Sequence, residues 1–278
     1  MGKTLLSFGY GYSAQALAPL LDGWRMIGTS RTASKPVQNG IERVQFPGED
    51  MGQHLDAATH LLISAGPDQE GDPVLRELRD EIAKRDFEWV GYLSTTGVYG
   101  DHQGDWVDED TPLTPSTRRG QWRAAAEAEW QGINLPLHIF RIAGIYGPGR
   151  GPFSKVRAGT ARRIIKDGQV FSRIHVEDIA QVVAASIAQP NAGAVYNLCD
   201  NDPAPPQDVI GYAAELLGMP LPAAIDYDTA DMTPMARSFY AESKRVKNDR
   251  IKDELGIVLK YPDYRAGLQA LLKLEATE

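Results

Sequence analysis

The feature that most constrains the fold is a glycine-containing turn between an apolar strand and an amphipathic helix near the N-terminus. Residues 4–6 are an apolar run, and residues 7–14 read Ser-Phe-Gly-Tyr-Gly-Tyr-Ser-Ala. Gly9 permits a tight turn, Gly11 leaves room for a phosphate against the backbone, and Ala14 lets the helix pack closely on the strand. This pattern is typical of a βαβ unit that binds the pyrophosphate of a dinucleotide. The alternative is a tight turn with a purely structural role.

The segment that follows the turn has the spacing of an amphipathic helix. Apolar residues recur at positions i, i+3, i+4 and i+7, which are Ala14, Leu17, Ala18 and Leu21. Pro19 lies within this segment, lacks a backbone N–H, and is expected to kink or shorten the helix. A helix in this place favours the dinucleotide-binding interpretation of the turn.

Short apolar segments and amphipathic segments alternate through the first half of the chain. Strands are predicted at 24–29, 44–46, 60–64, 89–94 and 137–141, and helices at 72–84 and after Pro115. This alternation predicts an α/β fold with a doubly wound parallel sheet, the Rossmann fold. Ligands of such sheets bind beyond the carboxyl ends of the strands. We therefore expect one cleft lined by the segments that follow four strands, at 9–11, 64–66, 94–96 and 141–144.

The composition changes after the Gly-Pro-Gly sequence at 147–149. A basic segment runs to Arg163, and a proline-rich stretch occupies 202–206. These features predict a smaller C-terminal lobe on the substrate side, made of residues 146–170 and 201–278. The Rossmann domain is predicted to comprise residues 1–145 together with 171–200, because the segment 174–187 has the pattern of a strand and a helix that return to the main sheet.

The overall charge and the cysteine content exclude several classes of partner. The chain of 278 residues has a formal net charge of −8 and a pI near 5.2, whereas nucleic-acid-binding proteins present a basic face to the phosphate backbone. Cys199 is the single cysteine, so no intrachain disulfide forms, and no Cys/His cluster has zinc-ligand spacing. The sequence has neither a signal-peptide pattern nor an apolar run of membrane-spanning length. We expect a cytoplasmic protein that holds no metal and binds neither nucleic acid nor membrane.

Five motifs occur in an order that identifies a family resemblance. They are Gly9-x-Gly11-x-x-Ala14, the run Leu-Ser-Thr-Thr-Gly-Val-Tyr-Gly at 93–100, Glu109-x-Thr111-Pro112, the run Arg-x-x-x-Ile-Tyr-Gly-Pro-Gly at 141–149, and Ile-His-Val-x-Asp-x-Ala at 174–180. With these motifs the chain resembles, nearly end to end, the extended short-chain dehydrogenase/reductase superfamily, the group that contains the NAD(P)-dependent epimerases and dehydratases. The resemblance implies a Rossmann domain, a C-terminal substrate lobe and a nicotinamide cofactor.

The chain departs from that family at the catalytic pair. Members carry Tyr-x-x-x-Lys just before a small-residue helix that ends in Ala-Glu, and counting back from Ala126-Glu127 puts these positions at Arg119 and Arg123. The tyrosine exchanges a proton with the reacting oxygen in the family, whereas a guanidinium stays protonated. The chain therefore looks most like the atypical members, which lack the active-site tyrosine.

The residues after the second predicted strand indicate which nicotinamide cofactor is bound. An NAD-specific protein places an acidic residue there, against the ribose 2′-hydroxyl, but this chain has Ser30 and Arg31. A hydroxyl and a guanidinium favour the 2′-phosphate of NADP. The alternative is a solvated arginine with NAD bound equally well. The predicted cofactor-binding residues are Gly9, Tyr10, Gly11, Tyr12, Ser13, Ala14, Ser30, Arg31, Ser64, Ala65, Gly66 and Ser94.

The catalytic candidates are Thr95, Arg119 and Arg123. Thr95 aligns with the family's catalytic Ser/Thr, and its alternative role is to cap its own backbone. Arg119 and Arg123 lie four residues apart on one helix face, where two guanidinium groups can hold a carboxylate or phosphate. The alternative is a solvated helix face on which Arg123 pairs with Glu127. The predicted substrate-binding residues are Thr96, Tyr99, Arg141, Tyr146 and His175.

Two functions from different classes fit these residues. The first is an oxidoreductase or isomerase that binds NADP(H) and acts on a small anionic substrate, with Thr95 and Arg119 stabilising a developing oxyanion. The second is a non-catalytic dinucleotide sensor, which the loss of Tyr-x-x-x-Lys favours. A substrate lobe favours the enzyme. A homodimer is conceivable in either case.

Overall fold

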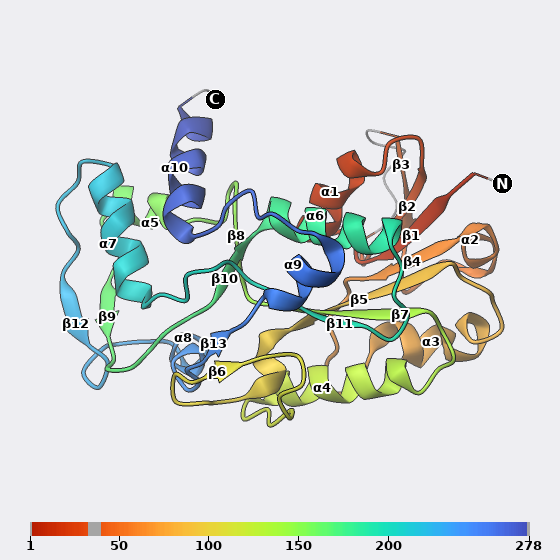
Figure 1. Ribbon diagram of the computed structural model, residues 1–278, viewed down its shortest axis with the longest axis horizontal. Helices are drawn as coiled ribbons and strands as arrows, with labels where there is room; N and C mark the ends of the chain where they lie inside the picture. Colours follow the sequence, from red (N-terminus) through yellow and green to blue (C-terminus); the bar gives the residue numbers. More distant parts are fainter. Residues whose placement is uncertain (1, 33–39, 277–278) are drawn as a thin grey trace.

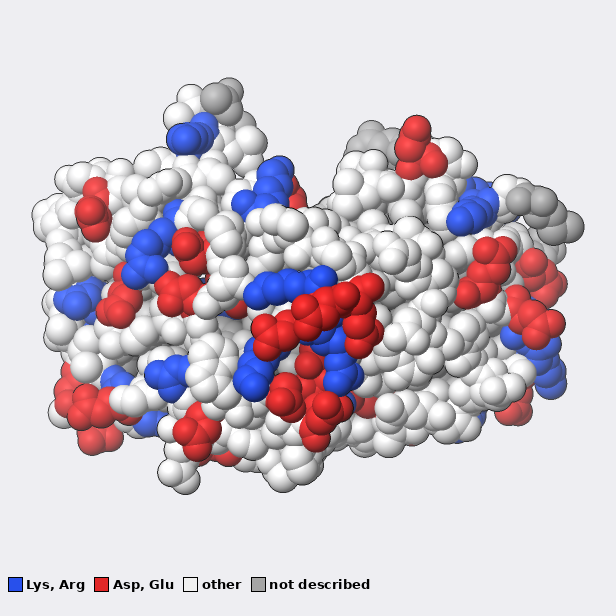
Figure 2. All heavy atoms as spheres, viewed as in Figure 1, with Lys and Arg blue, Asp and Glu red and all other residues white. Residues whose placement is uncertain are grey.

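The computed structural model describes residues 2–32 and 40–276, and it shows two parts (Figure 1). One part is a parallel sheet between two layers of helices. The other is a smaller group of helices and short strands built mainly from C-terminal residues. Side chains of Lys, Arg, Asp and Glu are intermixed on the face shown in Figure 2, and they gather most densely over α9 (Asp249–Leu255).

The larger part is built on a seven-stranded sheet in which every pairing is parallel. The prediction of a doubly wound α/β fold is confirmed. The strand order reverses between β1 and β4, so the loops after these two strands leave toward opposite faces and open a crevice between them. In spatial order the strands are β11 (Val195–Leu198), β7 (Leu137–Ile142), β5 (Trp89–Thr95), β4 (His60–Ile63), β1 (Thr4–Phe8), β2 (Arg25–Ser30) and β3 (Ile41–Gln45).

Helices cover both faces of this sheet because apolar residues on each face need a partner layer. The helices α1 (Tyr12–Leu17) and α6 (Val176–Ala188) pack together in one buried cluster on the first face. The opposite face packs against α2 (Gly52–Ala57), α3 (Pro73–Ile82) and α4 (Arg118–Gln131). Pro19 lies in a 3₁₀ turn, Ala18–Leu20, that ends α1, as expected for a residue without a backbone donor.

Two predicted elements differ from the structure by more than a shift of one or two residues at an end. The strand that follows β2 begins at Ile41, three residues before the predicted start at residue 44. Ile41 belongs to the sheet because it pairs with Met26 and is buried on the face that α1 covers. The predicted return of segment 174–187 to the main sheet is only half right. Its strand, β10 (Arg173–His175), pairs with β8 (Gly144–Tyr146) in a separate two-stranded sheet, whereas α6 packs on α1.

The smaller part has a core of its own, which includes Phe153, Ala213 and Leu268. Two further strand pairs join distant segments: β9 pairs with β12, and β6 pairs with β13. The elements of this part and its borders are β6 (Trp106–Val107), α5 (Phe153–Arg157), β9 (Arg163–Ile165), α7 (Pro206–Leu216), β12 (Ala224–Asp226), α8 (Pro234–Phe239), β13 (Arg245–Val246), α9 and α10 (Tyr264–Glu275).

Candidate functional site

The glycine turn after β1 is held in a conformation that requires its first glycine. Gly9 has a φ of 85°, and its backbone N–H donates to Oγ1 of Thr29 at 2.9 Å. A Cβ at this position would lie 2.9 Å from the backbone nitrogen of Ala65, closer than real contacts allow. The turn is therefore packed directly against the loop after β4, on the other side of the crevice.

The second glycine of the turn has different surroundings. Gly11 is the N-cap residue of α1, and a Cβ built on it would meet no described atom within 4 Å. The space that the sequence assigns to a pyrophosphate is thus open. Behind it, Ser13 and Ala14 are buried where α1 meets the sheet.

The two tyrosines of the turn, Tyr10 and Tyr12, contact different parts of the protein. Tyr10 donates its backbone N–H to the carbonyl oxygen of Thr29 at 2.9 Å, and its ring covers Gly28 of β2. Tyr12 points toward the C-terminal side, where its hydroxyl donates to the carbonyl oxygen of Pro148 at 2.9 Å and its ring stacks under Arg150. Tyr12 therefore links the turn to the loop after β8.

The residues predicted to choose the cofactor follow β2 at the same edge. The Ser30 hydroxyl donates to the carbonyl oxygen of Thr32 at 2.8 Å, and Arg31 is exposed. Within residues 2–32 and 40–276, Arg31 has neither a hydrogen bond from its side chain nor an ion pair, so its guanidinium is free to bind a ligand.

A cavity of about 1020 Å³ lies beyond the carboxyl end of β5, between the start of α4 and the C-terminal segments. It brings together four of the predicted residues, Thr95, Thr96, Arg119 and Arg123. The same cavity is also lined by Arg118, Phe239 and Lys244, and by three residues that sequence reasoning missed, Phe171, Arg173 and Glu242. Most of the charged side chains in the lining are basic, which favours an anionic ligand.

Close packing fixes the start of α4 against the end of β5. The N-cap residue Thr117 accepts the backbone N–H of Gly120 through Oγ1 at 3.2 Å. A Cβ on Gly120 would lie 2.7 Å from the carbonyl oxygen of Gly97, which belongs to the 3₁₀ helix η2 (Thr96–Tyr99). Only glycine permits this close approach of α4 to η2, and the approach places the arginines at the start of α4 in the lining of the cavity.

Arg123 bridges the end of β5 and the loop after β4. Its Nη1 donates to the carbonyl oxygen of Leu93 at 2.8 Å and to the Tyr92 hydroxyl at 3.2 Å. Its Nη2 lies 3.2 Å from the position of a Cβ on Gly66. The solvated helix face, with Arg123 paired to Glu127, is wrong because Glu127 is buried against other partners.

Arg119 and Thr95 both line the cavity, but they differ in their hydrogen bonds with the described residues. Arg119 is exposed, and its side chain has no hydrogen bond or ion pair with any residue that the structure describes. Thr95 Oγ1 accepts the backbone N–H of Gly97 at 3.2 Å, so it caps its own turn as the alternative role foresaw. That contact uses the oxygen as an acceptor and leaves the hydroxyl proton for donation into the cavity.

Three predicted ligand contacts instead belong to a buried polar network below the cavity. Ser94 donates its hydroxyl to Glu127, whose carboxylate accepts Nη2 of Arg141 at 2.9 Å. Arg141 Nη1 donates to the Tyr99 hydroxyl at 3.0 Å, which in turn donates to Asn197 Oδ1 at 2.7 Å. Burial raises the pKa of Tyr99 to about 12. Because Ser94, Tyr99 and Arg141 are buried, this placement gives them a supporting role under the strand ends.

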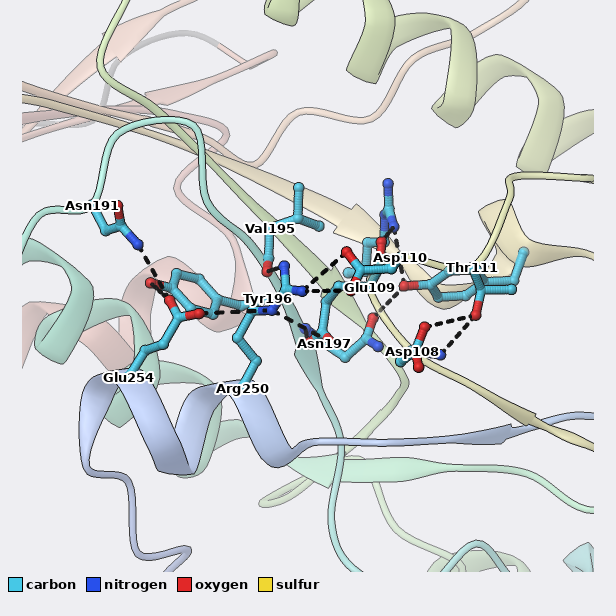
Figure 3. A network of polar contacts seen from close by, with 12 residues as sticks. Asp108, Glu109, Asp110, Thr111, Asn191, Val195, Tyr196, Asn197, Arg250 and Glu254 are labelled. Carbon is cyan, nitrogen blue, oxygen red and sulfur yellow. Dashed lines mark hydrogen bonds and ion pairs between the residues drawn. The ribbon is translucent and has the colours of Figure 1, made fainter.

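Figure 3 follows the network outward, to the Glu109-x-Thr111-Pro112 motif and α9. Glu109 Oε1 accepts the backbone N–H of Asn197 at 2.8 Å, and Arg250 reaches both oxygens of Asp110 at 3.1 Å. Glu254 accepts the Tyr196 hydroxyl at 3.0 Å. The motif therefore ties a loop and α9 to the edge strand β11.

Tyr146 and His175 lie where the two parts of the molecule meet, outside the cavity lining. His175 Nδ1 accepts the backbone N–H of Glu177 at 3.2 Å, and its ring centroid is 3.9 Å from that of Tyr261. Burial lowers the pKa of His175 to about 4, so the imidazole is neutral. The Tyr146 hydroxyl donates to the carbonyl oxygen of Asp263 at 3.4 Å. These contacts assign both residues to packing.

Neither a metal cluster nor a membrane span stands out. No group of three or more His, Cys, Asp or Glu residues within 2–32 and 40–276 is arranged to hold a metal ion. In the same ranges no helix has the length and apolar character needed to cross a bilayer.

Comparison with known proteins places the chain in a family. No family model matches the sequence. The Protein YeeZ of Escherichia coli is 30% identical over 94% of this chain and 97% of its own length. A solved structure of a putative NAD-dependent epimerase/dehydratase from Methylobacillus flagellatus is 26% identical, covers 99% of both chains and has a TM-score of 0.75. The chain belongs to the NAD-dependent epimerase/dehydratase family.

Within this family, similarity extends over the whole fold. A functionally unknown conserved protein from Silicibacter pomeroyi is 64% identical over 98% of both chains, with a TM-score of 0.92. The dTDP-glucose 4,6-dehydratase of Bacillus anthracis, solved in complex with NAD, shares the fold at 18% identity and a TM-score of 0.76. Both parts of this chain, the Rossmann sheet and the C-terminal segments, are therefore shared with relatives.

Proposed function

We propose that the chain is an NADP(H)-dependent oxidoreductase or isomerase that acts on a small anionic substrate. The observation that carries this proposal is the free guanidinium of Arg119 in the cavity beyond β5. Within the described ranges, the buried Arg141 is paired but Arg119 is not. An unpaired cation held by a closely packed helix start is a binding group for an anion.

The residues of the crevice fit a nicotinamide dinucleotide. Gly9 and Gly11 form a strand-to-helix turn with open space at the second glycine, and fold neighbours such as the B. anthracis dehydratase bind NAD. The sequence aligns Arg123 with the family's lysine, and its contacts with Leu93 and Gly66 at the strand ends support a place for it near the nicotinamide end. When bound, the cofactor supplies or accepts a hydride, which is chemistry that no side chain of the cavity offers.

The side chains of the cavity perform the remaining tasks. Arg119 binds the anionic group and orients the substrate, and Thr95 donates its hydroxyl proton in a hydrogen bond to the reacting oxygen. Neither arginine on this helix face replaces the family's tyrosine, because a guanidinium does not give up its proton near neutral pH. The substrates of ordinary family members, the sugar nucleotides, are therefore expected to give no turnover.

The first test asks whether the turn binds the cofactor. Gly11→Val places a side chain in the open space at the turn, so we expect it to abolish NADPH binding in calorimetry. The far-UV spectrum and cooperative melting should stay unchanged, since a Cβ at this position meets no described atom. Normal binding by this variant would make the turn purely structural.

The second test separates an enzyme from the non-catalytic sensor. Protein loaded with NADP(H) is screened by thermal shift against anionic metabolites, and each stabilising compound is checked for conversion by absorbance and mass spectrometry. We expect a compound whose stabilisation is lost in Arg119→Gln and whose conversion falls in Thr95→Val, which removes the hydroxyl but keeps the volume. The protein is a sensor and not an enzyme if the cofactor binds, no metabolite reacts, and a protein partner is captured with only one redox state of the cofactor.

A further inference from the structure

Another arginine of the sheet, Arg43 on β3, lies over the ring of Tyr10 in the glycine turn. Its guanidinium carbon lies 4.4 Å from the centroid of the Tyr10 ring. Arg43 is half-buried, and its side chain makes no hydrogen bond or ion pair with any residue in 2–32 and 40–276. A half-buried guanidinium in that state retains all its N–H donors for a ligand.

The position of Arg43 follows from the register of the sheet. Gly28 of β2 is the pairing partner of Arg43, so their Cα atoms are neighbours and their side-chain positions share one face. The absence of a side chain at Gly28 lets the Tyr10 ring pack against β2, because a Cβ there would come within 2.6 Å of the ring. The ring in turn supports the guanidinium of Arg43.

This stacking prepares Arg43 to bind a phosphate. A ring under the face of a guanidinium holds the group in place and leaves its in-plane donors free. The nearest carboxylates along the chain are engaged elsewhere: Glu42 accepts Arg25 Nη2 at 2.7 Å, and Glu49 accepts the backbone N–H of Gln45 at 2.9 Å. They therefore leave Arg43 without a local counter-ion.

Arg43 lies beside the end of β2, where the ribose end of the cofactor is expected. Ser30 pairs with Gln45, two residues after Arg43, and Arg31 follows directly, so the three β-strands β1, β2 and β3 bring the turn and both arginines to one edge (Figure 1). We propose that Arg43, stacked on Tyr10, is a cofactor-discriminating residue that binds the 2′-phosphate of NADP(H) together with Ser30 and Arg31. This inference rests on the proposed function, since it needs a nicotinamide dinucleotide in the crevice.

The test compares NADPH with NADH in calorimetric titrations of the full chain. We expect Arg43→Gln to weaken NADPH binding by about tenfold or more, and to leave NADH binding within about twofold, because only NADPH carries the 2′-phosphate. The probe 2′,5′-ADP should lose affinity in the same variant, whereas 5′-ADP should not. Arg31→Gln combined with Arg43→Gln should erase the preference for NADPH.

Arg79→Gln is the matched control, because Arg79 is exposed on α3, which packs on the other face of the sheet from Tyr10, and provides the same change of charge. It should leave both affinities unchanged. The inference is overturned, with the proposed function intact, if Arg43→Gln leaves NADPH binding unchanged or weakens NADPH and NADH equally. If the unmodified protein binds neither dinucleotide, the proposed function and this inference fail together. Unchanged melting of Arg43→Gln separates a lost contact from a lost fold.

Discussion

Two arginines close to the end of β5 differ in what they contact, although both were expected to reach the substrate. Arg141 is buried and its charge is neutralised by Glu127 at 2.9 Å. Arg119 lines the cavity and has no partner within the described residues. A buried charge needs a partner to offset its lost hydration, whereas an exposed charge in a cavity does not. The comparison teaches that arginine at a strand or helix end marks a ligand only where the protein leaves it unpaired.

The largest effect should follow from breaking the buried pair. Glu127→Gln removes the carboxylate and leaves the Arg141 guanidinium buried without its counter-ion. We expect a loss of about 3 kcal/mol or more in the free energy of unfolding, measured by urea denaturation. Glu129→Gln, two residues away on α4, is the control and should change stability by no more than about 0.5 kcal/mol. A loss below about 1 kcal/mol for Glu127→Gln would show that the network is not needed for stability.

The next effect concerns the buried imidazole, which lies outside the cavity. The pKa of His175 falls to about 4 in the folded protein because of burial, whereas an unfolded histidine titrates near 6.5. The unfolded chain therefore binds the proton first, and stability falls as the pH drops from 6.5 toward 4. The expected contribution is up to about 3 kcal/mol over that range.

A comparison between the unmodified protein and His175→Gln isolates this contribution. Burial raises the pKa of Asp178 to about 6 and that of Asp200 to about 8. These two carboxyl groups therefore contribute less to the stability of the folded protein as the pH rises, which is the opposite direction from His175. Their contribution cancels in the difference between the two proteins. That difference should shrink as the pH falls below 6.5 in urea denaturation series. A difference independent of pH would mean that His175 binds its proton as readily in the folded protein as in the unfolded chain.

The smallest effect on stability should come from the free arginine. Arg119→Gln removes no hydrogen bond or ion pair with the described residues, so we expect the free energy of unfolding to change by no more than about 0.5 kcal/mol. Thermal melting without ligands provides the measurement. A loss of stability well above that value would show that Arg119 has a partner in the protein, and the contrast with Arg141 would then be wrong.

The parts of the fold that local patterns specify were predictable. The glycine turn, the alternation of strands and helices, and the end of α1 at Pro19 follow from turn chemistry and periodicity. Thr95 and Arg119 meet in one cavity because strand ends and helix starts gather at one edge of a parallel sheet. These relationships depend on short stretches of sequence.

The remainder depends on long-range packing and orientation. Strand β7 is buried on both faces, so its sequence does not reveal that Arg141 points into the interior. Phe171 and Glu242 line the same cavity from segments more than 70 residues after Thr95, and no local signal marks them. Arg43 was missed because its significance depends on the register that puts it beside Gly28.

Anion binding in the cofactor-loaded protein tests the central contrast most directly. With NADPH present, the melting temperature is followed against increasing succinate and inorganic phosphate at constant ionic strength, for the unmodified protein, Arg119→Gln and Arg79→Gln. Arg79 is exposed on α3 and provides the same change of charge. We predict that at least one anion stabilises the unmodified protein and Arg79→Gln in a saturable manner, and that this stabilisation is absent in Arg119→Gln. Equal stabilisation of all three proteins, or of none, would contradict the assignment of Arg119 as the group that binds the substrate's anion.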